Sequence, residues 1–279
     1  MDILRYVAFS VDPAGGNPAG VVLDASGMDE ATMGAVAAEV GYSETAFATP
    51  RPDGTLDVRY FSPKAEVSFC GHATIATAVA HADRHGVGDL LLHTMAGPVP
   101  VTTSTRPDGS LVATLVSVEP RTAEITDSDL AELLDALRWS ATDLAPALPP
   151  RAAYAGAWHP VIASADRARL ADLDYDMPAL GALMARRDWA TVALVHRETD
   201  TVFHARNPFP PGGVVEDPAT GAAAAALGGY LRDLGLVDPP AVLTIHQGVD
   251  MGRPSLLTVG IPADQTGGIE VTGTAVPIA

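Results

Sequence analysis

Ionisable side chains lie in two short turns, and each turn leads into a helix rich in small residues. The first turn, FCGHAT, contains Cys70 and His72, and the second, EDPATG, contains Glu216 and Asp217. A helix start leaves backbone N–H groups unpaired and carries a partial positive charge, so it favours a bound carboxylate. Two such starts facing one cleft would bind a carboxylate-bearing substrate beside groups that transfer protons. The same turns also fit plain helix caps and a hydrogen-bonded structural histidine.

Glu44 is a further candidate for proton transfer. It lies in GYSETAFAT, just after the predicted helix stop at Gly41 and at the head of an apolar strand. A glutamate there normally faces solvent. If the strand lines a cleft, partial burial would suit its carboxylate to general acid/base chemistry near neutral pH. The local pattern fits both interpretations.

The two helices that follow the turns indicate a repeated architecture. FCGHATIATAVAHADRHG ends at Gly86 and EDPATGAAAAALGGYLRDLG ends at Gly235, and these glycines are 149 residues apart, about half the chain. Helices this rich in Ala and Gly allow a sheet to approach closely on all sides. We therefore predict two related halves, each a strongly bent sheet around a central helix.

The other predicted elements follow from turn and cap signals. A helix over Glu30–Val40 is expected, with Asp29 as its cap. The tetrapeptide RPDG, a strong turn signal, occurs at 51–54 and at 106–109 between β-rich runs. The remaining predictions are strands at 3–11 and 21–24 joined by a turn at 12–20, strands at 45–49, 55–61 and 111–118, a polar helical region at 119–142, a loop at 143–151, and a hairpin of 189–197 with 201–206. The domains are predicted as residues 1–118 and 119–279, with the final strand able to pack back on the first domain.

Composition excludes several classes of function. Lys and Arg total 17 against 34 Asp and Glu, a net charge of −17 that repels phosphate backbones and excludes nucleic acid as a partner. No apolar run approaches the roughly 20 residues of a membrane span, and the first residues do not resemble a signal peptide. One cysteine excludes an intrachain disulfide and fits a reducing compartment. We expect a cytoplasmic protein without a membrane partner.

Neither a cofactor nor a metal is predicted. GxGxxG and Walker-type loops are missing from the sequence, so nucleotide cofactors are not indicated. His81 and His85 are four residues apart in a predicted helix, a spacing that zinc sites also use, but an obvious third ligand is missing.

Five segments, taken in order, resemble the signature segments of the phenazine-biosynthesis, PhzF-like family. They are GGNPAGVV at 15–22, SETAF at 43–47, FSPKAEVSFCGHAT at 61–74, EDPATG at 216–221 and HQGVDMGRPS at 246–255. The resemblance spans almost the whole chain. It implies an α+β fold of two pseudo-equivalent diaminopimelate epimerase-like domains, each a curled, mostly antiparallel sheet around a central helix. It places the active site in the cleft between them and implies a homodimer without cofactors.

The resemblance also implies residue roles. Glu44 would be the base that moves a proton within a small carboxylate-bearing substrate, and His72 and Asp217 would orient that substrate. Glycines let backbone amides approach a substrate carboxylate closely. The implied substrate-binding residues are Asn17, Cys70, Gly71, Ala73, Thr220, Gly221 and Ala222.

Two alternatives stay open, and one departure from the family favours the non-catalytic one. Where the family often has serine after the Thr-Gly pair, this chain has Ala222, which removes a hydroxyl that could bind substrate. A two-base amino-acid racemase or epimerase could instead use Cys70, as a thiolate favoured by the helix start, with Asp217. A binding protein that retains the site without catalysis is the other alternative.

Overall fold

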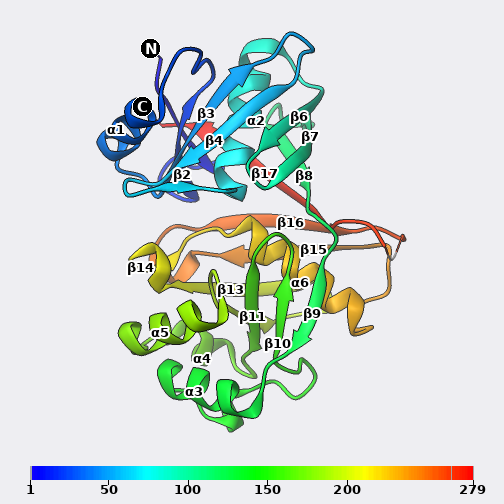
Figure 1. Cartoon of the computed structure of the whole chain (residues 1–279). Coiled ribbons are helices and arrows are strands. Elements are labelled where there is room, and N and C mark those ends of the chain that lie inside the picture. Colours follow the sequence, from blue (N-terminus) through cyan, green and yellow to red (C-terminus); the bar gives the residue numbers. More distant parts are fainter. Residues whose placement is uncertain (1, 265, 279) are drawn as a thin grey trace. The chain divides into compact units, whose positions relative to one another are not determined.

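The computed structural model describes residues 2–264 and 266–278 of the chain. It divides into two compact units, residues 1–116 with 271–279 and residues 117–270 (Figure 1). The helices are α1 Glu30–Val40, α2 Gly71–His85, α3 Asp127–Leu137, α4 Arg167–Ala171, α5 Met177–Arg187 and α6 Gly221–Asp233, with short 3-10 helices η1 Ala141–Asp143, η2 Pro210–Gly212 and η3 Val249–Met251.

In the first unit the strands form a closed ring around α2. They are β1 Leu4–Ala8, β2 Asn17–Val22, β3 Glu44–Pro50, β4 Leu56–Phe61, β5 Glu66–Val67, β6 Asp89–Thr94, β7 Gly97–Thr105, β8 Leu111–Val116 and β17 Glu270–Pro277. The ring runs β1–β2–β3–β4–β6–β7–β8–β17 and returns to β1, with β5 paired to β4. The pairs β2–β3 and β4–β6 are parallel. The first ten residues of α2 are all buried, because their small side chains let the strands close around the helix.

In the second unit the strands curl around α6. They are β9 Arg121–Glu124, β10 Arg151–Tyr154, β11 Trp158–Ala163, β12 Ala193–Arg197, β13 Val202–Phe209, β14 Val214–Asp217, β15 Ala241–Gln247 and β16 Ser255–Ile261. They pair in the order β9–β10–β11–β12–β13–β15–β16, with β14 on β13. Residues 223–232 of α6 are all buried, and α6 packs against β9, β10, β11 and β16.

The two units repeat one pattern of strand pairing. In the first unit the successive strand pairs are antiparallel for β1–β2, parallel for β2–β3 and antiparallel for β3–β4. The short strand β5 follows, and then a parallel pair, β4–β6, and an antiparallel pair, β6–β7. From β10 to β16 the joins follow the same succession. The central helices start at Gly71 and Gly221, directly after the short strand and its turn. The predicted α+β fold of two pseudo-equivalent units, each a mostly antiparallel curled sheet around a helix, is confirmed.

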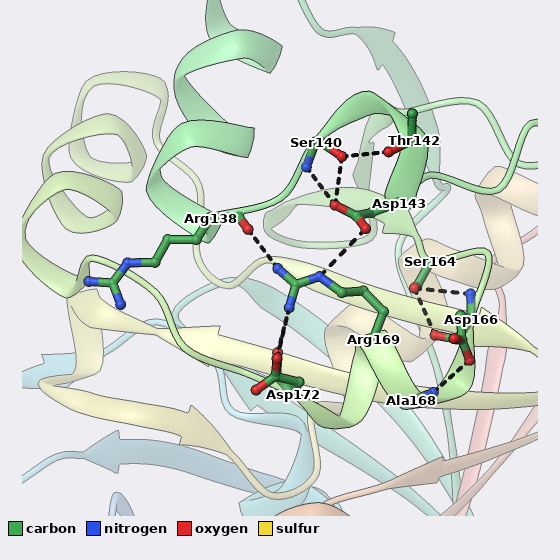
Figure 2. A network of polar contacts seen from close by, with 9 residues as sticks. All are labelled: Arg138, Ser140, Thr142, Asp143, Ser164, Asp166, Ala168, Arg169 and Asp172. Carbon is green, nitrogen blue, oxygen red and sulfur yellow. Dashed lines mark hydrogen bonds and ion pairs between the residues drawn. The ribbon is translucent and has the colours of Figure 1, made fainter.

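Helices α3, α4 and α5 cover part of one face of the second unit's sheet. Their leucines form a core with Ile162 of β11 and Leu194 of β12. Arg169 on α4 ties this layer together, because its guanidinium donates to the carbonyl oxygen of Arg138 at 2.7 Å and to that of Asp172 at 3.2 Å (Figure 2). Its Nε also lies 3.8 Å from Asp143, whose carboxylate caps η1 through Ser140.

Several predicted local elements are confirmed. Helix α1 has the predicted bounds, the Asp29 carboxylate accepts from the Thr32 N–H at 2.9 Å, and Gly41 closes the helix at a φ of 72°. Both RPDG turns join antiparallel strands, and Gly54 and Gly109 supply the positive φ values of 84° and 86°. The predicted hairpin of β12 and β13 is also present.

Other predictions were wrong in extent. The second strand begins at Asn17 instead of 21, because Ala8 pairs with Asn17 and extends the ladder. Gly16 makes the tight approach possible, since a Cβ there would lie 2.4 Å from the Ala8 carbonyl oxygen. The region 119–142 is not helical throughout, because 121–124 pairs with β10 as strand β9. Strands β10 and β11 and helices α4 and α5 were not predicted. None of the helices in the described part of the chain combines the length and apolarity of a membrane span.

Candidate active site

Four predicted site residues of the first unit lie together, with His72 at their centre. Asn17 begins β2, Glu44 begins β3, Cys70 is the N-cap of α2, and His72 lies in the first turn of that helix. The Nε2 atom of His72 is 3.5 Å from Oε2 of Glu44. The Glu44 side chain is only 13% exposed, so of the two interpretations of this carboxylate, partial burial holds and exposure to bulk solvent does not.

Strand pairing brings these residues to one end of the sheet. Strands β2 and β3 are parallel and Ala19 pairs with Glu44, so Asn17, two residues earlier on the same face, lies beside that carboxylate's strand. Gly20 permits this close pairing. A Cβ at Gly20 would lie 2.5 Å from the Thr45 hydroxyl oxygen.

Hydrogen bonds orient the His72 imidazole. The Asn17 amide nitrogen lies 3.1 Å from Nδ1, and the Cys70 sulfur lies 3.3 Å from the same atom. An imidazole that accepts the amide N–H at Nδ1 carries its own proton on Nε2. That nitrogen faces the Ser43 hydroxyl at 3.4 Å as well as Glu44. The arrangement places the protonated nitrogen of His72 on the side of the ring that faces the Glu44 carboxylate.

A buried tyrosine braces the first turn of α2 from beneath. The Tyr60 hydroxyl is 2.7 Å from the Thr74 hydroxyl, and Thr74 donates to the Cys70 carbonyl oxygen at 2.8 Å. Burial raises the pKa of Tyr60 far above its ordinary value, so the phenol stays protonated and acts as a hydrogen-bond donor.

In the second unit, Asp217 and Thr220 form a turn closed by Gln247. The Thr220 hydroxyl donates to Oδ2 of Asp217 at 2.5 Å. The Gln247 amide nitrogen donates to the Asp217 carbonyl oxygen at 2.7 Å, and its carbonyl oxygen accepts the Thr220 N–H at 3.0 Å. Gln247 is almost fully buried, so its two ends hold the turn rigidly at the start of α6.

Glu216, one of the ionisable candidates from the sequence, has a structural role. Its carboxylate forms a buried, two-point ion pair with Arg206, through Nε at 2.9 Å and through Nη2. Arg206 also donates to the Ala171 carbonyl oxygen at 2.5 Å. Both oxygens of Glu216 are engaged by Arg206, so Asp217 is the remaining acidic candidate of this turn.

The remaining predicted binding residues lie in the first turns of the two helices. Gly71 and Ala73 are buried at the start of α2, and Gly221 is buried at the start of α6. Ala222 is partly exposed there, so a serine hydroxyl at this position would have been accessible to a ligand.

Sequence reasoning did not single out Ser43 and Gln247. Both lie inside segments that carry the family resemblance, SETAF and HQGVDMGRPS, so membership of those segments was the signal available. Their contacts are with residues distant in the sequence, which local patterns do not reveal.

The group of Glu44, Cys70 and His72 has ligand atoms within 4.8 Å of one another. Among the described residues it is the one set of three possible metal ligands found this close together. His81 and His85, the pair with zinc-like spacing, have ring centroids 4.5 Å apart but belong to no such group in the described part of the chain.

Comparisons with known proteins agree with this fold. The model of a family described as phenazine biosynthesis-like protein matches residues 6–279. The chain is 32% identical to the uncharacterized isomerase YfhB of Bacillus subtilis, over 99% of this chain and 96% of that protein. It is 33% identical to trans-2,3-dihydro-3-hydroxyanthranilate isomerase of Pseudomonas chlororaphis, over 96% of this chain and 94% of that protein. A crystal structure of a Bacillus anthracis phenazine biosynthesis protein of the PhzF family superimposes with a TM-score of 0.89 at 26% identity, covering 100% of this chain and 98% of that one.

The fold and these relatives define an isomerase built from two curled sheets, each around a helix of small residues. The chain belongs to the phenazine biosynthesis-like, or PhzF, family, as its sequence segments predicted.

Proposed function

We propose that the chain is a cofactor-independent isomerase in which the Glu44 carboxylate moves a proton within a small carboxylate-bearing substrate. The observation that carries the proposal is the contact of this largely buried carboxylate with His72 Nε2 at 3.5 Å. A positioned carboxylate with a fixed donor beside it is the equipment of general acid/base catalysis.

The reaction needs no redox partner or co-reactant. Glu44 takes a proton from a substrate C–H, and the electron pair left behind shifts through an adjacent double bond. The protonated Glu44 then returns the proton to the carbon at the far end of the shifted pair. The carboxylate regenerates, so atoms, charge and electrons balance. His72, held by Asn17, keeps its Nε2–H on Glu44 and holds the carboxylate in position between the two transfers.

The proposal assigns substrate binding to residues of both units. Backbone N–H groups in the first turn of α2, at Gly71 and Ala73, are suited to a carboxylate because of the helix start and the small side chains. Asp217 is proposed to orient the substrate's polar groups, and Thr220 and Gly221 at the start of α6 to bind it. The bracing of the Asp217–Thr220 turn by Gln247 supports that role, because a fixed acceptor orients a ligand better than a mobile one.

The first substrate to test is trans-2,3-dihydro-3-hydroxyanthranilate, which the Pseudomonas chlororaphis relative is named for isomerising. Ala222 lacks the hydroxyl that many family members supply, so we expect a substrate with one fewer hydrogen-bonding group at that point to be preferred. Cyclic amino and hydroxy acids form the panel around this compound.

The main alternative is a two-base racemase that uses Cys70. The 3.3 Å contact between its sulfur and His72 Nδ1 favours it, because an imidazole can take up the thiol proton. The repeat disfavours it. When the two helix starts are aligned, the residue equivalent to Cys70 is Thr220, whose hydroxyl is no base at neutral pH. Asp217 lies three residues before that equivalent position.

Deuterium labelling tests the proposal. Candidate substrates are incubated with the full chain in deuterated water and followed by NMR. Isomerisation gives a relocated double bond with label at the new C–H, diluted where the carried proton does not exchange. Racemisation gives label at an inverted centre with an unchanged skeleton, and a non-catalytic binder gives no label. The last two outcomes reject the proposed reaction.

Two further parts of the proposal concern assembly and location. We propose a homodimer, as the family resemblance implies, and a cytoplasmic location, which agrees with a sequence that has one cysteine and so forms no intrachain disulfide. Light scattering coupled to gel filtration gives the mass directly, and a monomer across the micromolar range would reject the dimer.

A further inference from the structure

Three histidines form a row across neighbouring strands of the second unit. His196 on β12 pairs with His204 on β13, and His204 pairs with His246 on β15. Directly paired residues project from the same face of a sheet with Cβ atoms about 5 Å apart. The three imidazoles therefore share one face, and none of them belongs to the proposed active site.

Glu198 adds a carboxylate to this row. It lies one residue beyond the end of β12 and two residues after His196, and its Oε2 lies 2.6 Å from Nε2 of His204, on the face that carries the row. The rings of His204 and His246 stack with centroids 5.3 Å apart and planes at 25°. Glu198 thus contacts His204 by a hydrogen bond, and His204 contacts His246 through its ring.

His196 is oriented as metal-binding histidines usually are. Its Nδ1 lies 3.2 Å from the carbonyl oxygen of Ser164, a residue whose hydroxyl bonds to Asp166 before α4 (Figure 2). An Nδ1–H donated to a backbone carbonyl leaves Nε2 as the nitrogen with a lone pair. Such an outer hydrogen bond fixes the tautomer and orientation of a metal ligand.

The face that carries the row is open to a cation. Alternate residues on the opposite face, such as Val195 and Ile245, are buried. On the histidine face, Val242 of β15 is 63% exposed, and the Glu198 side chain is 55% exposed. In the described part of the chain, Nδ1 of His204 is buried without a hydrogen-bond partner, so that ring is not fully satisfied by its protein contacts.

We propose that His196, Glu198, His204 and His246 bind one divalent first-row transition-metal ion, for which Zn²⁺ serves as the probe. Imidazole nitrogen and carboxylate oxygen are ligands of Zn²⁺, and four of them complete its tetrahedral shell. Rotation of the side chains is needed to bring the four ligand atoms onto one ion. Bound metal would link β12, β13 and β15 and stabilise the second unit.

Zinc titration of the metal-stripped full chain, in competition with a chromophoric chelator, tests the proposal. We expect one site in the wild type. His204→Ala and His246→Ala should each weaken it by at least about tenfold, in line with the sensitivity of metal sites to loss of supporting groups. His85→Ala, from the helical histidine pair, and Cys70→Ser, from the proposed active site, are the matched controls and should bind as the wild type does.

Two results overturn the proposal. They are unchanged binding in both His204→Ala and His246→Ala, and loss of binding in Cys70→Ser, which would place the metal at Glu44, Cys70 and His72. If His204→Ala does not fold, as judged by circular dichroism, the milder His196→Gln and Glu198→Gln carry the test. Co²⁺ gives an independent readout, since bound sulfur adds a strong near-ultraviolet charge-transfer band and a nitrogen–oxygen site does not. The proposed isomerase reaction uses none of the four residues, so failure of the metal proposal would leave the proposed reaction unaffected.

Discussion

The starts of the two central helices have the same backbone plan and different chemistry. Aligned at Gly71 and Gly221, the first unit has Cys70 and His72 where the second has Thr220 and Ala222. Glu44 of β3 pairs with Ala19, the third residue of β2. The nearest equivalent in the second unit is Ala193 of β12, which pairs with Val161, the fourth residue of β11. At these three positions the first unit therefore has ionisable groups and the second has small or neutral ones.

The difference teaches how a duplicated fold divides its tasks. In the first unit a carboxylate, an imidazole and a thiol lie in contact, so protons can move among them. In the second unit one carboxylate is held by Arg206 and the other accepts the Thr220 hydroxyl, so the turn presents fixed hydrogen-bonding groups. Under the proposed function, the helix start of the first unit transfers protons and the helix start of the second orients the substrate.

The largest expected effect comes from removing the charge of Glu44. Glu44→Gln keeps the shape but cannot accept a proton, so turnover should fall by about 10²–10⁴-fold, the usual contribution of a positioned acid/base group. Substrate binding, measured by calorimetry, should persist. The exposed Glu39→Gln on α1 is the control and should be fully active. Wild-type turnover in Glu44→Gln would contradict the single-carboxylate mechanism.

A buried histidine of the second unit, His159, predicts that the free energy of unfolding depends on pH. His72 faces a carboxylate, whereas His159 contacts the Thr191 hydroxyl at 2.9 Å, and burial lowers the pKa of His159 from 6.5 to about 4. The unfolded chain therefore binds the extra proton between these pH values. The His159 contribution is complete above pH 6.5 and is lost as the pH falls to 4, on the order of 3 kcal/mol.

Urea unfolding of the wild type and His159→Gln at pH 7 and pH 4.5 measures this effect. The variant should lose less free energy of unfolding than the wild type over the same interval. Equal pH dependence in the two proteins would show that His159 is not the group responsible.

Loss of the Gln247 brace should weaken the Asp217–Thr220 turn at the start of α6. Gln247→Ala removes both ends of a buried amide that holds Asp217 and Thr220, at a cost of about 1–3 kcal/mol in transition-state binding or stability. The positioning role predicts that KM rises or kcat falls while Glu44-dependent exchange of label persists. Gln247→Glu is the matched variant, since it keeps the acceptor for Thr220 N–H and loses the donor.

Cys70→Ser should have the smallest effect. If the thiol only fills space and contacts His72, turnover should change by less than about threefold, since serine is close in size. Complete loss of activity with an intact fold would favour the two-base racemase and reverse the assignment of the proton-transferring pair.

Much of the architecture was predictable because its signals are local. Asp29 with Gly41, and the two RPDG turns, determine their elements through nearby backbone geometry. Strand β9 was missed because its four residues depend on pairing with β10, thirty residues later. For the site, the resemblance named Glu44 and His72, but their contact depends on long-range strand register. The hydrogen bonds of Glu216 to Arg206 and of Gln247 to Asp217 likewise involve partners that no local pattern contains.

The path of the chain through the first unit has a consequence for biosynthesis. Strand β17 pairs with both β1 and β8 and closes the ring around α2, yet residues 117–270 are translated before it. Throughout that interval the edges of β1 and β8 await their partner, and exposed edges are prone to pair with other chains. The nascent first unit therefore completes its barrel only after the ribosome has delivered the whole of the second.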